Sequence, residues 1–84
     1  ATLYEPTSGR VMEVLTTQPG VQVYTANWVE KQIGKYGKTY AKQNSICIET
    51  QNFPNSPNIA HFPSSILRPG EIYEEMCIYK FSVK

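Results

Sequence analysis

SICIETQNFPNSPN, residues 45–58, is the stretch that decides how the chain folds. Its first half alternates between two sets of side chains, and this period of two predicts a strand with one buried apolar face. Pro54 and Pro57 would end that strand, and the asparagines around them predict a stiff polar loop. Glu49 would then project from a strand end beside a rigid loop, a geometry that holds one reactive group still. Because a glutamate on a half-buried strand more often simply faces water, the residues alone leave both interpretations open.

Strands separated by proline–glycine turns flank this stretch on both sides. Residues 10–17 (RVMEVLTT) and 21–25 (VQVYT) are rich in β-branched and apolar side chains, which predicts two strands. The QPG turn at 18–20 predicts that they form a β-hairpin, with the glycine at a positive φ. Residues 71–83 follow a second turn, at 68–71, and predict the longest strand, apolar on both faces. The chain is therefore expected to be all-β and to form a sandwich.

Residues 26–42 are the least regular part of the chain. Asn27 followed by Glu30 predicts one capped helical turn, which the next glycine would end. The lysines of this region predict an exposed loop, beneath which Tyr36 and Tyr40 are expected to pack.

The bulk composition bounds the class of protein. With 84 residues the chain holds one domain at most, and so short a chain buries only about 60–65% of its unfolded surface. A hydrophobic fraction of 40%, with six tyrosines, three phenylalanines and one tryptophan, excludes a disordered segment. A net charge of +1 argues against nucleic-acid binding through phosphate neutralisation. The short apolar runs predict no membrane span, and with no signal peptide visible we expect a cytoplasmic protein.

The cysteines and the histidine do not indicate a metal site. Cys47 and Cys77 are expected to be free thiols on strands, although a disulfide between neighbouring strands stays open. One histidine and two cysteines without close spacing make no zinc site, so no metal is expected. The sequence contains no Walker loop, Rossmann glycines or HExxH motif.

Three sequence blocks together resemble the galactose mutarotase (aldose 1-epimerase) family. The blocks are TQPG at 17–20 leading into QVYT at 22–25, ETQ at 49–51 followed by Pro54 and Asn58, and LRPGE at 67–71. They stand in the family's order and spacing, and the resemblance runs from about residue 9 to residue 84. It implies a large β-sandwich, of which residues 1–84 would form the C-terminal part of a single aldose 1-epimerase domain.

The resemblance also implies an activity and two site residues. The family interconverts the α and β anomers of an aldohexose such as D-galactose or D-glucose, without a cofactor. Glu49 matches the family's base, which takes the proton of the C1 hydroxyl, and burial against apolar neighbours would favour that role. Gln22 matches a glutamine that contacts the sugar, and its amide offers both donors and an acceptor. Without the resemblance, Gln22 would be interpreted as a polar residue on the wet face of a hairpin.

The chain departs from the family pattern in one respect. The family's proton-donating histidine lies well upstream of these blocks, so the remainder of the domain is an expected partner. His61 matches no catalytic position and is expected at the surface or packed on Phe62. Three hypotheses stay open: part of a complete mutarotase, a non-catalytic carbohydrate-binding module, or an inactive fragment that associates through exposed strand edges. The parent would be a stand-alone mutarotase or a fusion with UDP-galactose 4-epimerase.

Overall fold

The computed structural model describes residues 1–84 and consists of strands joined by loops. The strands are β1 (Thr2–Glu5), β2 (Arg10–Thr16), β3 (Gly20–Tyr24), β4 (Gln32–Ile33), β5 (Thr39–Tyr40), β6 (Cys47–Gln51) and β7 (Cys77–Val83). Two short 3-10 turns, Lys35–Gly37 and Ser56–Asn58, are the helical elements. The expectation of an all-β chain is confirmed. No helix is long and apolar enough to cross a membrane.

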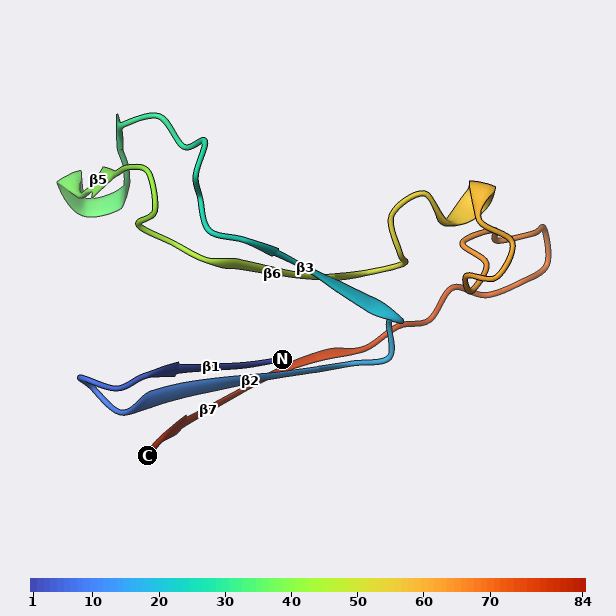
Figure 1. Cartoon of the computed structure of the whole chain (residues 1–84), viewed down its shortest axis with the longest axis horizontal. Coiled ribbons are helices and arrows are strands. Elements are labelled where there is room, and N and C mark those ends of the chain that lie inside the picture. Colours follow the sequence, from blue (N-terminus) through green and yellow to red (C-terminus); the bar gives the residue numbers. More distant parts are fainter.

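The strands lie in two layers (Figure 1). One layer is an antiparallel sheet in the order β1-β2-β7, and both termini lie in it. The other is the antiparallel β3–β6 ladder, while β4 and β5 form a separate small pair. The two layers meet around Val14 of β2, which is buried.

The hairpin predicted between residues 10–17 and 21–25 is wrong. β2 is hydrogen-bonded to β1 on one side and to β7 on the other, so it has no free edge for β3. The chain crosses instead into the second layer, where β3 pairs with β6. Gly20 is not at a positive φ. A Cβ at position 20 would lie 2.8 Å from Cδ1 of Phe53, so the ring could keep its place only beside a glycine.

Side chains at the crossing hold the segment that precedes β7. The Thr17 N–H and the Thr16 hydroxyl both donate to the Met76 carbonyl, at 3.1 and 3.0 Å. The Met76 N–H donates to the Thr17 hydroxyl at 2.9 Å, and the Gln18 amide donates to the Tyr73 hydroxyl at 2.6 Å. These bonds take the place of ladder pairing, so the strand predicted at 71–83 begins only at Cys77.

Residues 26–44 form an arm that extends from the end of the β3–β6 ladder (Figure 1). Its base is closed by the Gln43 N–H, which donates to the Ala26 carbonyl at 3.1 Å. The helical turn predicted from Asn27 is wrong. The Val29 N–H donates to the Ala26 carbonyl at 3.4 Å and closes an isolated turn that is not helical. The chain then continues into β4 and β5 rather than into a helix.

The two tyrosines of the arm behave differently from each other. The Tyr40 ring lies against Gly34, and its hydroxyl accepts a hydrogen bond from the Lys35 N–H at 3.2 Å. Tyr36 is 96% exposed, so the expectation that it packs beneath the loop is wrong. Its φ of 56° places it in a left-handed turn.

Residues 52–76 form the long loop between β6 and β7. The stiff polar segment expected after β6 contains the turn Ser56–Asn58, where the Asn58 amide donates to Asn55 Oδ1 at 2.6 Å. The predicted turn at 68–71 is confirmed, with the Glu71 N–H donating to the Arg68 carbonyl at 3.0 Å. Gly70 lies at a φ of 88°, a conformation that glycine adopts freely.

The chain buries little of its own surface. Its accessible area is 7156 Å², whereas a compact domain of 9.5 kDa exposes about 5000 Å². Its radius of gyration is 16.8 Å, against about 12 Å for a compact domain of this length. Val14 and Ala26 are the only buried apolar residues. The two layers therefore touch without enclosing a core of their own.

Candidate active site

Gln22 and Glu49, two candidates from separate parts of the sequence, lie directly opposite each other in the β3–β6 ladder. Directly opposed residues of antiparallel strands leave the same face of a sheet, with their Cβ atoms about 4.5–5.5 Å apart. The fold therefore brings a carboxylate and a carboxamide together in one pair. We call these two residues the polar pair.

The polar pair points away from the three-stranded sheet. Val21 and Thr50, the chain neighbours of the pair, point to the opposite face of the ladder. Together with Val14 of β2 they line a cavity of about 150 Å³ between the layers. On the same side, the Tyr79 hydroxyl of β7 donates to the Ile48 carbonyl at 3.5 Å. The polar pair is thus on the outer face of the ladder.

Both members of the polar pair are exposed to solvent. The burial expected for Glu49 against apolar neighbours is therefore not provided by this chain. Glu49 forms no ion pair within the chain, whose ion pair joins Lys80 and Glu13 at 3.1 Å on the other sheet. Because Glu49 has no cationic partner and both side chains are exposed, the polar pair is free to contact a ligand.

An aromatic cluster borders the polar pair at the end of the ladder where β3 begins. The Phe53 ring lies against Gly20, which is paired with Gln51. Phe53 packs on Phe62 with ring centroids 5.0 Å apart, and His61 packs edge-on to Phe62 at 4.8 Å. His61 was expected at the surface or packed on Phe62, and the structure shows it exposed and also packed on Phe62. The Phe53–Gly20 contact is not predicted by the sequence patterns above, although a glycine in a strand is a signal that another group approaches closely.

The aldose 1-epimerase family model matches residues 1–80. The chain belongs to the aldose 1-epimerase family. It is 49% identical to the galactose mutarotase of Homo sapiens over 84 residues, which are 99% of this chain and 25% of the human protein. The mouse (Mus musculus) galactose mutarotase is 52% identical over 77 residues, 90% of this chain and 22% of that protein. The Escherichia coli aldose 1-epimerase is 32% identical over 72 residues, 83% of this chain and 21% of that protein.

The chain spans about a quarter of the length of the curated relatives it matches. The family and the β-strand architecture agree with the fold class expected from the sequence. Large apolar side chains of both layers, among them Leu15, Val21 and Val23, are exposed in this chain.

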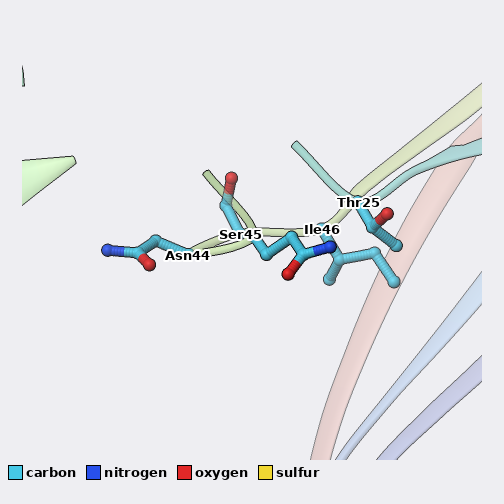
Figure 2. Close-up of a pocket in the computed structure, with 5 residues that line it drawn as sticks. Thr25, Asn44, Ser45 and Ile46 are labelled. Carbon is cyan, nitrogen blue, oxygen red and sulfur yellow. The ribbon is translucent and has the colours of Figure 1, made fainter. Parts of the chain in front are cut away.

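A wide, open hollow of this aldose 1-epimerase segment lies away from the polar pair. It measures about 550 Å³ and is lined by Thr25 and residues 43–46, where the arm meets the ladder. Figure 2 shows the side chains of Asn44 and Thr25 pointing away from one another, so they do not converge on one ligand. The lining of this hollow includes neither Gln22 nor Glu49. We place the candidate site at the polar pair, where the reactive groups are.

The cysteines are unpaired, as expected, and the alternative of a disulfide between them is wrong within this chain. Cys47 is half-buried and Cys77 is exposed. The charge of the neighbouring Cys77 side chain, together with a hydrogen bond between the two side chains, raises the pKa of Tyr79. No group of three or more His, Cys, Asp or Glu side chains is arranged to hold a metal ion.

Proposed function

We propose that residues 1–84 form the C-terminal part of a single aldose 1-epimerase domain, which interconverts the α and β anomers of D-galactose or D-glucose. The observation that carries this proposal is the pairing of Gln22 with Glu49 on the outer face of the β3–β6 ladder. One bound sugar can contact both side chains, because paired residues lie within a few ångströms of each other. The names of the relatives, galactose mutarotase and aldose 1-epimerase, support the same reaction class.

In the proposed mechanism Glu49 is the base. Its carboxylate takes the proton of the C1 hydroxyl while the bond between C1 and the ring oxygen breaks. The bonding electrons pass to the ring oxygen, which receives a proton from a histidine outside this chain. Rotation about the C1–C2 bond then presents the other face of the aldehyde, and the reverse proton transfers close the ring. The steps move protons only and need no cofactor, and both groups must lie within hydrogen-bond reach of the sugar.

Gln22 is the proposed sugar-binding residue beside the base. Its amide can donate to one hydroxyl oxygen and accept from a second hydroxyl, which holds the sugar over Glu49. Removing such a neutral hydrogen bond typically weakens binding by about three- to tenfold.

The remainder of the domain is the proposed partner of this segment. The polar pair is open to solvent here, which supports a pocket whose acid and further walls come from outside the chain. The uncovered inner faces of the two layers support the same conclusion, because they need further strands to exclude water. We also propose a cytoplasmic location, with which two free thiols are compatible.

The test is the time course of optical rotation after α-D-galactose or α-D-glucose is dissolved at neutral pH. The full-length protein is expected to accelerate the approach to equilibrium well beyond the spontaneous rate. Gln22→Ala is expected to raise KM about three- to tenfold and to change kcat less. A full-length, folded protein that leaves the spontaneous rate unchanged for both sugars would rule out the proposed function.

A further inference from the structure

A second side chain lies on the same face of the ladder as the polar pair. Gly20 and Gln22 share a face of β3, because residues two apart in a strand point the same way. A Cβ added to Gly20 would lie 2.8 Å from Cδ1 and 3.0 Å from Cε1 of Phe53. The Phe53 ring therefore occupies the space over Gly20, on the outer face. The next pair on that face is Gln22–Glu49, about 7 Å along the strands.

The Phe53 side chain packs on a second aromatic ring, and its backbone is hydrogen-bonded. Phe62 packs on it with ring planes tilted by 54°, and His61 in turn packs on Phe62. The Phe53 carbonyl accepts a hydrogen bond from the Ser56 N–H at 3.1 Å, which fixes the backbone at this position. The side chain is nevertheless only half-buried. Part of the Phe53 side chain is thus exposed, on the face of the ladder that carries the polar pair.

We propose that Phe53 is the apolar wall of the sugar-binding site. An aldohexose whose C1 hydroxyl meets Glu49 would lay the C–H face of its ring on Phe53, while its hydroxyls meet the polar pair. The π face of an aromatic ring is electron-rich and attracts the weakly positive C–H bonds of the sugar. Small-molecule sites commonly combine an aromatic wall with a few well-placed polar groups. This inference rests on the proposed function and adds a substrate contact to it.

Gly20 is a positioning residue in this arrangement. It touches no substrate, but the absence of a Cβ lets the Cδ1–Cε1 edge of the Phe53 ring come close to the ladder. Alanine at position 20 would push the ring outward from its place beside the polar pair. Gly20→Ala and a substitution of Phe53 itself are therefore expected to disturb the same contact by two independent routes.

The experiment measures KM and kcat of the full-length protein by polarimetry with α-D-galactose. Phe53→Leu keeps apolar bulk on Gly20 but removes the aromatic face, and is expected to raise KM about three- to tenfold with kcat changed less than about twofold. Gly20→Ala is expected to raise KM in the same way, whereas Phe53→Trp keeps KM near that of the wild type. Phe81→Leu, the same chemical change on β7 of the other sheet, is the matched control and is expected to leave KM unchanged.

The outcomes separate this inference from the proposed function. An active wild type whose KM is unchanged in Phe53→Leu would overturn the role of Phe53 and leave the role of Glu49 intact. If Phe53→Leu does not fold, as thermal melting would show, an unchanged KM in Gly20→Ala overturns the inference instead. An inactive full-length wild type would overturn the proposed function and this inference with it.

Discussion

The isolated 84-residue chain is not expected to keep the described arrangement as a monomer. The chain exposes 7156 Å², about 2100 Å² more than a compact domain of its mass. Apolar atoms usually make up somewhat more than half of a protein surface, so roughly 1200 Å² of that excess is apolar. At about 25 cal/mol per Å², the isolated chain lacks up to about 30 kcal/mol of hydrophobic stabilisation that burying this area would supply. Since the net stability of a domain is about 5–15 kcal/mol, the two layers alone cannot hold this arrangement.

The assay is size-exclusion chromatography with light scattering, together with amide NMR spectra, on the isolated 84-residue chain. We expect concentration-dependent oligomers or poorly dispersed amide signals, because the apolar inner faces and free strand edges will associate. The full-length protein under the same conditions is the control and should give sharp, dispersed signals. An isolated chain that stays monomeric with dispersed amide signals at high concentration would refute this reasoning.

Two further predictions concern elements of the described fold. The Glu5 carboxylate accepts hydrogen bonds from the Ser8 hydroxyl and from the Ser8 and Thr7 N–H groups, which lower its pKa from 4.5 to about 2. The stability that this carboxylate contributes is therefore present above pH 4.5 and is lost as pH falls toward 2. The difference in melting temperature between wild type and Glu5→Gln should shrink over that interval. A difference that stays constant with pH would contradict this. Thr17→Ala removes the hydroxyl that accepts from the Met76 N–H and should lower the free energy of unfolding of the full-length protein by about 1 kcal/mol in urea titrations; no change in the urea midpoint would contradict the role of this bond.

Alternation and turn chemistry were sufficient to predict several strands from the sequence. The period of two at residues 45–51 predicted β6, and the resulting pairing placed Glu49 on the opposite face from Ile48. The proline–glycine turn at 18–20, in contrast, gave a wrong hairpin. A local turn signal says that the chain reverses or bends, but not which strand edge is free, and here β1 and β7 occupy both edges of β2.

The candidate site was predictable as two residues but not as a pair. The family resemblance pointed to Gln22 and Glu49 one at a time, and only the β3–β6 register shows that they are direct neighbours. The contact of Phe53 with Gly20 was missed, because it joins a loop to a strand more than thirty residues away in sequence. Such long-range packing is set by tertiary structure, and local sequence patterns do not encode it.

The most direct test of the central claim compares Glu49→Gln with Glu13→Gln in the full-length protein. Both substitutions remove one carboxylate from an antiparallel strand, but Glu13 lies on β2 and pairs with Lys80, away from the polar pair. We predict that Glu49→Gln lowers kcat for the mutarotation of α-D-galactose by about a hundredfold to ten-thousandfold, the usual contribution of a general base. Glu13→Gln should retain wild-type activity, and both variants should keep the wild-type circular dichroism spectrum. Near-full activity of a folded Glu49→Gln protein would contradict the assignment of Glu49 as the base.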